Sequence, residues 1–155
     1  MSYEKEEIFL PVAIKLREGF ILVVGGGKAA LQKIQSLLQF TRKIKVISTK
    51  ILKEIEEFGV EFKKDAYNDR YLEDAILVYA CTDDKKINQK IAEDARIRGL
   101  MVCISDNPVE SDFISPAIFR KDYMTVAVTS NARDVKRSIA WRDRIKELDK
   151  EEGLP

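Results

Sequence analysis

Residues 20–30 of the chain read FILVVGGGKAA, and this stretch decides the fold. Its first five residues form a continuous apolar run rich in branched side chains, which is typical of a strand buried on both faces of a parallel sheet. Three glycines end the run, and apolar residues then recur at helical spacing from Ala29 to Phe40. A strand, a glycine turn and a helix in this order predict the first βαβ unit of a dinucleotide-binding fold.

The turn fits the pattern G-x-G-x-x-G/A, with Gly25, Gly27 and Ala30 at the patterned positions. The first glycine permits a tight turn, the second lets the backbone approach a pyrophosphate, and the alanine lets the helix pack closely on the strand. The helix that begins here directs free N–H groups and the positive end of its dipole at the turn. The sequence therefore predicts a phosphate site; a glycine turn without a ligand is the alternative.

Strands and helices continue to alternate through the first 112 residues. Further strands are expected at residues 44–47, 60–62, 76–80 and 101–104. Helices are expected at residues 51–58 and from residue 87 to the stop signal at Gly99. This alternation predicts an α/β fold, a Rossmann-type parallel sheet with helices on both faces, whose ligands bind beyond the carboxyl ends of the strands.

The pattern changes after residue 112, where no crossover helix separates the next two strands. The expected order is a strand at residues 118–119, a link at residues 120–122, a strand at residues 124–128 and a helix at residues 134–150. We therefore expect a dinucleotide-binding Rossmann domain at residues 1–112, followed at residues 113–155 by a small β-hairpin layer and a C-terminal helix.

The charge balance argues against a polyanionic partner. Lys and Arg number 27 against 26 Asp and Glu, so the net charge of +1 predicts no general attraction to nucleic acid or a membrane surface. The longest apolar stretches, such as residues 76–81, are too short to span a membrane, and the charged N-terminus has no apolar signal core behind it. We expect a cytoplasmic protein that contacts neither nucleic acid nor membrane.

Two residue types limit the chemistry. The chain has no histidine, which excludes imidazole bases, Ser-His and Cys-His pairs and His-rich zinc sites. Cys81 and Cys103 end β-like runs and are expected to be packing residues rather than a disulfide, although their positions leave a reactive thiol open. Proton transfer therefore falls to carboxylates, Lys, Tyr, Cys or Ser.

The acidic residue that usually hydrogen-bonds the cofactor ribose is missing. About 20 residues after the glycines an NAD enzyme ordinarily has Asp or Glu, but residues 47–50 of this chain read ISTK. Ser48 and Thr49 can hydrogen-bond a ribose, and Lys50 can accommodate a 2′-phosphate or stand as a solvated surface lysine, the interpretation we prefer. The sequence therefore leaves NAD against NADP open.

Polar residues gather at the ends of two later strands. Residues 80–84 read ACTDD, where Thr82 or Asp83 would face the cofactor cleft, and either can also cap the following helix. Asp106 ends the fifth strand, where a carboxylate can remove a proton or hold a metal. A turn-forming Asp before Asn107 and Pro108 is the alternative.

Six short motifs occur together in a specific order and spacing over most of the chain. They are LPV at residues 10–12, LVVGGG at 22–27 with Ala30 and Lys33 behind it, ACTDD at 80–84 with Asn88, DNP at 106–108, DFISPA at 112–117 and VAVTS at 126–130. In these motifs, from Phe9 to about Ser130, the sequence resembles the precorrin-2 dehydrogenase family, the dehydrogenase and ferrochelatase module of siroheme synthase.

The resemblance implies an enzyme that oxidises precorrin-2 to sirohydrochlorin with NAD as hydride acceptor, with or without a second activity that inserts ferrous iron to give siroheme. It implies a homodimer joined through residues 113–155, the dimerisation and substrate-contacting segment. Asp106 matches the family's catalytic Asp, the base in dehydrogenation and a transient iron ligand in chelation. The residues that would contact NAD are Gly25, Gly26, Gly27, Lys28, Ala29, Thr49, Lys50 and Thr82.

The substrate implied by the resemblance is a tetrapyrrole edged with carboxylates. Ser130 falls on the family's Ser at the mouth of the active site. A local group of basic residues would pair with those carboxylates, and Arg120 and Arg133 are the members expected to bind the substrate. The alternative for each of these cations is that it lies on the solvated surface without binding substrate. The group consists of Arg120, Lys121, Arg133, Lys136 and Arg137.

The match weakens after Ser130. The family has a Gly-rich turn there and then Ser-Pro, whereas residues 131–135 read NARDV, and the chain stops at Pro155 where members continue into a helical domain. These departures favour an alternative, a non-catalytic dinucleotide-binding sensor or accessory module. A nucleotide-sensing domain of a transporter regulator is ranked last, because it gives no reason for residues 106–108 and 113–117. The retained Asp106 favours the enzyme.

Overall fold

The computed structural model describes residues 7–155 of the chain. The chain divides into two compact units, one formed by Ile14–Phe113 and the other by Ile114–Pro155 together with residues 7–13. The second unit therefore combines segments from both ends of the described chain.

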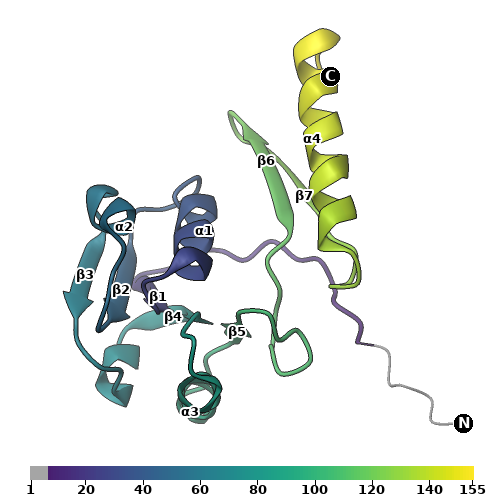
Figure 1. Ribbon diagram of the computed structural model, residues 1–155. Helices are drawn as coiled ribbons and strands as arrows, with labels where there is room; N and C mark the ends of the chain where they lie inside the picture. Colours follow the sequence, from purple (N-terminus) through teal and green to yellow (C-terminus); the bar gives the residue numbers. More distant parts are fainter. Residues whose placement is uncertain (1–6) are drawn as a thin grey trace, which may run out of the picture. The chain divides into compact units, whose positions relative to one another are not determined.

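The first unit is built on a five-stranded sheet (Figure 1). Its order is β3-β2-β1-β4-β5, and every neighbouring pair is parallel. The strand after the first crossover lies on one side of β1 and the fourth strand lies on the other, so β1 is central. This confirms the predicted Rossmann-type parallel sheet. The strands are β1 (Phe20–Val24), β2 (Ile44–Ser48), β3 (Glu61–Lys64), β4 (Ala75–Ala80) and β5 (Val102–Ile104).

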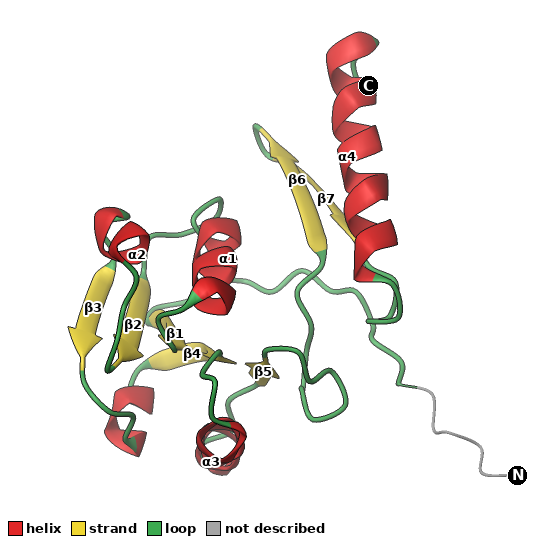
Figure 2. Ribbon diagram, in the orientation of Figure 1, coloured by secondary structure: helices red, strands yellow, loops and turns green. Residues whose placement is uncertain are grey.

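Helices cover both faces of this sheet, as predicted (Figure 2). Helices α1 (Lys28–Leu37) and α2 (Lys53–Glu57) bury Ala30, Ile34 and Ile55 against one face. Helix α3 (Lys85–Ile97) and the 3-10 turn η1 (Asp69–Leu72) pack on the other. A helix on each side of a parallel strand follows from right-handed crossovers that leave the central strand in opposite directions.

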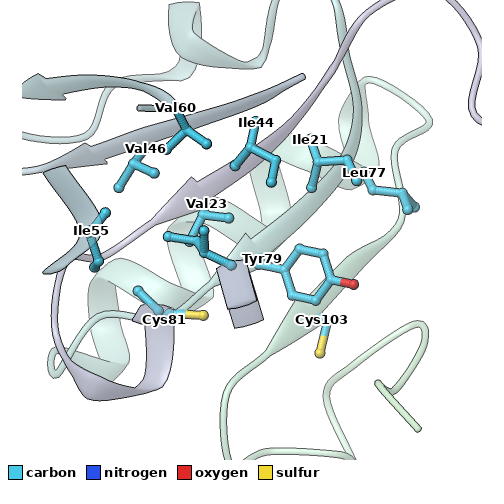
Figure 3. Close-up of a cluster of buried hydrophobic side chains, with 12 residues drawn as sticks. Ile21, Val23, Ile44, Val46, Ile55, Val60, Leu77, Tyr79, Cys81 and Cys103 are labelled. Atoms are coloured by element: carbon cyan, nitrogen blue, oxygen red, sulfur yellow. The ribbon is translucent and has the colours of Figure 1, made fainter. Parts of the chain in front are cut away.

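The alternation of side chains along β1 supplies both halves of the core. Ile21 and Val23 point to the face of α1, while Leu22 and Val24 point to the face of α3. All four are at most 2% exposed, and burying an aliphatic side chain of this size contributes about 1.5–3 kcal/mol. Figure 3 shows Ile21 and Val23 beside their neighbours on β2 and β4. This double burial explains why residues 20–24 contain no polar side chain.

The cysteines are also part of this core. Cys81 and Cys103 are both free and buried on the face of α1 (Figure 3), so the prediction that they pack rather than form a disulfide is confirmed.

Local details of the first unit differ from expectation at its edge. Strand β3 was expected to be partly exposed, and all four of its residues are exposed because it is the outermost strand. Lys63 and Lys64 on this strand discourage pairing with another chain. The helix expected at residues 51–58 covers only Lys53–Glu57, and the turn η1 was not predicted.

The second unit contains an antiparallel hairpin and one long helix. Strands β6 (Ala117–Lys121) and β7 (Met124–Val128) pair so that Lys121 lies opposite Met124. The expected link at residues 120–122 is therefore wrong: Arg120 and Lys121 belong to β6, and the turn is Asp122-Tyr123, with Asp122 in the left-handed region (φ 53°). Nζ of Lys121 lies 2.9 Å from Asp149, which ties the hairpin to helix α4 (Val135–Glu151).

Helix α4 is capped by Asp134, whose side chain accepts a hydrogen bond from the backbone of Arg137. Across residues 7–155, no helix combines the length and apolar character needed to cross a bilayer.

Candidate functional site

The three glycines after β1 meet different surroundings. A Cβ on Gly25, whose φ is +128°, would lie 2.3 Å from the carbonyl oxygen of Cys81. A Cβ on Gly26 would lie 2.1 Å from the carbonyl oxygen of Lys50, whereas one on Gly27 would meet nothing within 4 Å. The first two glycines therefore let the chain after β1 pass between the ends of β4 and β2. Gly27 leaves a face open at the start of α1.

The first turn of α1 is free to bind an anion. Gly27, its N-cap residue, offers no side-chain hydrogen bond, and the turn carries no acidic side chain. The first backbone bond of the helix runs from the N–H of Leu31 to the carbonyl of Gly27 (3.0 Å), so the N–H groups of Lys28 and Ala29 have no intrahelical acceptor. These donors and the helix dipole point at the open face of Gly27 and favour a phosphate there.

The segment after β2 lies against the glycine turn. The carbonyl of Gly26 accepts a hydrogen bond from the backbone of Leu52 (2.9 Å), and the N–H of Gly25 donates to Ile47 at the end of β2 (2.9 Å). Thr49 and Lys50, which connect these two contacts, are exposed. The structure thus brings the expected cofactor residues of the glycine turn and of residues 49–50 to one edge of the sheet, and their contact with a cofactor stays a prediction.

The loop after β4 is held in place by the buried side-chain amide of Asn88. The side chain of Asn88, 6% exposed, accepts from the backbone of Thr82 (3.2 Å) and donates back to its carbonyl (3.0 Å). The hydroxyl of Thr82 lies 2.6 Å from Oδ1 of Asn88. The helix cap is Asp84, which accepts from Lys86 and Ile87, so the expectation that Thr82 or Asp83 caps α3 is wrong. Thr82 remains half-buried at the carboxyl edge.

Asp106 stands alone at the same edge. The backbone of Ser105 donates to Ala80 (2.9 Å), which places Asp106 one residue beyond the paired ends of β4 and β5. Its carboxylate is exposed, and within residues 7–155 it accepts no hydrogen bond and joins no ion pair. Adjacent strands lie about 4.8 Å apart, so the end of β5 is about 10 Å from the glycine turn at the end of β1. A carboxylate without a partner within residues 7–155 therefore lies at the edge of the sheet at which a dinucleotide would bind.

The thiol nearest to this edge is not a nucleophile at neutral pH. Burial raises the pKa of Cys81 to about 12, and the neighbouring Cys103 adds to the shift while Lys33 opposes it. The charge of Asp106 raises this pKa further. A protonated thiol neither attacks nor ligates, so acid–base chemistry here falls to the carboxylate.

The loop that carries Asp106 contains polar residues to which the sequence assigned no role. Ser111 and Asp112 bind the outer edge of β5, because the backbone of Ile104 donates to the Ser111 hydroxyl (2.8 Å) and that of Val102 donates to Asp112 (2.9 Å). No local signal distinguishes them from ordinary loop residues, since their partners lie seven and ten residues away.

The expected substrate residues lie in the second unit. The hydroxyl of Ser130 accepts from the backbone of Asp134 (2.8 Å), and the N–H of Arg133 donates to the Ser130 carbonyl (3.1 Å), so Ser130 and Arg133 share one turn. Arg120 lies on β6, opposite Thr125. Lys121 is engaged by Asp149 and so is not available as a member of the expected basic group.

The turn after Ser130 keeps a conformation that glycine favours. Asn131 and Ala132 both have positive φ, 58° and 61°. The amide of Asn131 accepts from the backbone of Phe9 (2.6 Å) and donates to the carbonyl of Glu7. The missing glycines are thus replaced by an asparagine with its own hydrogen bonds and by an alanine held in the left-handed region.

Within residues 7–155, no three His, Cys, Asp or Glu side chains gather in a way that could hold a metal ion. The expected role of Asp106 as a transient iron ligand stays a prediction that rests on one carboxylate.

A parallel sheet of this order, with a glycine turn after its central strand and an uncapped helix behind it, defines a Rossmann-type dinucleotide-binding domain. A family model described as "Putative NAD(P)-binding" matches residues 12–117, which is more than half of the chain. The chain belongs to that family, and a nicotinamide dinucleotide is the class of cofactor that this membership supports.

Named relatives are similar to this chain over a longer stretch than the family model. The siroheme synthase of Chromobacterium violaceum is 32% identical over 144 residues, which cover 90% of this chain and 31% of the relative. That of Nitrosospira multiformis is 32% identical over 130 residues, 79% of this chain and 28% of the relative. The chain thus spans less than a third of the length of either relative.

A solved structure described as "SirC, precorrin-2 dehydrogenase" has the same fold. Its TM-score is 0.77 at 21% sequence identity, over 95% of this chain and 71% of that one. The parallel sheet, the hairpin and the C-terminal helix are therefore a known arrangement of elements.

Proposed function

We propose that this chain is an NAD-dependent precorrin-2 dehydrogenase, which oxidises precorrin-2 to sirohydrochlorin in siroheme biosynthesis. One observation carries the proposal: Asp106 presents a carboxylate without a partner within residues 7–155, at the sheet edge that also holds the glycine turn. A structural aspartate would be expected to cap a turn or pair with a cation. The similarity to siroheme synthases over 90% of the chain supports the same assignment.

The cofactor end of the site fits NAD. Its pyrophosphate would lie over Gly27 and accept from the N–H groups of Lys28 and Ala29, while Thr49 and Lys50 would meet the adenosine ribose. Thr82 would border the nicotinamide side, because it follows β4. When bound, the nicotinamide ring supplies the acceptor for a hydride.

Loss of a hydride and a proton from the substrate needs a base. Asp106 would take the proton, since its carboxylate is exposed and no other side chain within residues 7–155 occupies it by hydrogen bond or ion pair. The substrate's own carboxylates would pair with Arg120 and Arg133, with Ser130 beside them. In this proposal the unit Ile14–Phe113 is the cofactor domain, and Ile114–Pro155 supplies the dimerisation and substrate-contacting segment of a cytoplasmic homodimer.

Insertion of ferrous iron into sirohydrochlorin is a further part of the proposal. Asp106 would then take up the two protons that the macrocycle loses one at a time, passing each to solvent, and would hold the iron only transiently. This step is tested separately, by adding ferrous iron once the dehydrogenation is measured.

The test is anaerobic incubation of the full chain with enzymatically generated precorrin-2 and NAD, with NADP in parallel, following the absorbance of NADH and sirohydrochlorin. Both products should form in a protein-dependent manner. Asp106→Asn should lower the turnover by about 100-fold or more with NAD affinity unchanged. Glu93→Gln, which neutralises an exposed carboxylate on α3, is the matched control and should behave as the parent.

Two results would contradict the proposal. Parental turnover in Asp106→Asn would remove the carboxylate from the reaction. NAD binding without any product would instead favour the second candidate, a non-catalytic dinucleotide-binding module, for which the altered turn after Ser130 is the supporting observation.

A further inference from the structure

The outer edge of β5 is paired by side chains. Because β5 ends the sheet, its outward N–H groups have no neighbouring strand. Oδ2 of Asp112 accepts from the backbone of Val102 (2.9 Å), the N–H of Asp112 donates to the Val102 carbonyl (2.8 Å), and the Ser111 hydroxyl accepts from Ile104 (2.8 Å). The loop 105–112 therefore folds back along β5 as a substitute for a sixth strand.

The end of this loop is bound to α3. Nε of Arg96 lies 3.1 Å from Oδ1 of Asp112, and its NH2 group donates to the carbonyl of Glu110 (2.5 Å). Within the loop, the amide of Asn107 donates to the Glu110 carboxylate (2.9 Å) and accepts from the Glu110 backbone (3.3 Å). The polar side chains from residue 107 to residue 112 are thus bound within the unit, while that of Asp106 is not.

The hydroxyl of Ser111 reaches both sides of Asp106. Besides accepting from the N–H of Ile104, its Oγ lies 2.7 Å from the carbonyl oxygen of Asn107 and 3.2 Å from that of Ile104. The single hydroxyl proton goes to the nearer acceptor, Asn107. One side chain consequently joins the residue two before Asp106 to the residue after it.

The backbone at Asp106 needs such a constraint. Its φ of 59° lies in the left-handed region, which costs an L-residue free energy and which Asp tolerates better than most. A residue in that region keeps its conformation when the surroundings over-determine it. The turn bond from the N–H of Asn107 to the carbonyl of Ile104 (3.2 Å) and the Ser111 bridge both join residue 104 to residue 107 across Asp106.

We propose that Ser111 is a positioning residue for Asp106: by clamping Ile104 to Asn107, its hydroxyl holds the Asp106 carboxylate in the direction of the cofactor edge. The inference rests on the proposed function, since it assigns Ser111 a part in the use of Asp106 as a base. A base held within a fraction of an ångström of its target proton works far better than one that must be reoriented.

The test compares kcat for precorrin-2 oxidation and Kd for NAD across single and double variants of the full chain. Ser111→Ala should lower kcat about 10- to 100-fold and leave Kd for NAD unchanged, because the glycine turn lies two strands away. Ser111→Thr, which keeps the hydroxyl, should retain most of the activity. Ser111→Cys keeps the shape with only a weak donor and acceptor, and gives a folded comparison if Ser111→Ala does not bind NAD.

The decisive measurement is the double variant. If Ser111 acts through Asp106, adding Ser111→Ala to Asp106→Asn should cause no further loss of kcat. An equal fractional loss in both backgrounds would overturn the proposal, and so would parental kcat in Ser111→Ala and Ser111→Cys. Ser36→Ala removes from α1 a hydroxyl that has no hydrogen-bond partner within residues 7–155, and serves as the control.

Failure of this inference is distinguishable from failure of the proposed function. If Asp106→Asn keeps the parental turnover, the proposed role of Asp106 as the base is refuted. If Asp106→Asn has a low kcat while the Ser111 variants keep the parental kcat, only the positioning role of Ser111 is refuted.

Discussion

Gly27→Ala is expected to separate cofactor binding from folding. A Cβ at this position meets no atom within 4 Å, and the φ of −93° is open to alanine. Replacing glycine where the backbone already suits alanine stabilises a protein by about 0.4–1 kcal/mol. Alanine is a poorer N-cap than glycine by roughly 0.5–1 kcal/mol. The two effects nearly cancel, so the free energy of unfolding should change little.

Binding should change much more. The new methyl group would stand on the open face of Gly27 and lift a pyrophosphate away from the N–H groups of Lys28 and Ala29. Loss of one hydrogen bond to a charged group costs about 1.5–3 kcal/mol, which raises Kd for NAD by more than about tenfold.

Calorimetric titration with NAD gives Kd, and urea unfolding followed by circular dichroism gives the stability of the same samples. Gly26→Ala is the matched comparison, because its Cβ would lie 2.1 Å from the Lys50 carbonyl and must displace backbone. It should lower both stability and affinity. A parental Kd for Gly27→Ala would refute the reasoning, since the pyrophosphate would then not approach over this glycine.

Three further outcomes are expected. Ala132→Gly should stabilise the second unit by about 1 kcal/mol, because it relieves a left-handed alanine (φ 61°), whereas Ala140→Gly inside α4 should destabilise it by a similar amount, about 1 kcal/mol; a loss of stability in the first variant, measured by urea unfolding, would contradict the strain. Lys50→Asp should raise the ratio of NAD to NADP affinity by about tenfold or more, as a carboxylate accepts from the ribose 2′-hydroxyl and repels a 2′-phosphate; titrations with both cofactors check this, and an unchanged ratio would mean that residue 50 does not meet the ribose. Stability should fall between pH 9 and pH 12, because burial raises the pKa of Cys81 from 9.0 to about 12 and the unfolded thiol ionises first; the slope for one thiol is about 1.4 kcal/mol per pH unit, so the decline should be shallower in Cys81→Ala than in the parent, and identical slopes would contradict the shift.

Most of the fold follows from short-range sequence signals. The apolar run at residues 20–24, the glycines behind it and the return of helical spacing are enough to predict β1, the turn and α1, since each depends on neighbouring residues. The same holds for β4, which ends where the polar residues begin. The position of Asp106 at the end of a strand was also predictable, because parallel strands end at one edge of the sheet.

The details that failed depend on neighbours in space. The exposure of β3 is decided by its place at the edge of the sheet, which its alternating pattern does not encode. The cap of α3 is Asp84, while Thr82 is bound to Asn88. The hairpin turn lies at residues 122–123 and not at the expected 120–122, because Arg120 and Lys121 pair with residues of β7.

Sequence alone determined that this chain has a dinucleotide-binding sheet, a glycine turn and a carboxylate at Asp106, since these depend on local periodicity and on residues whose backbone freedom or charge is intrinsic. Only the tertiary structure decided that Gly26 must lie against Lys50, that Gly27 faces open space, and that Ser111 bridges both sides of Asp106. The first and third are contacts and the second is the absence of one, and all three depend on which segments folding brings together. Spacing along the sequence carries no record of such contacts.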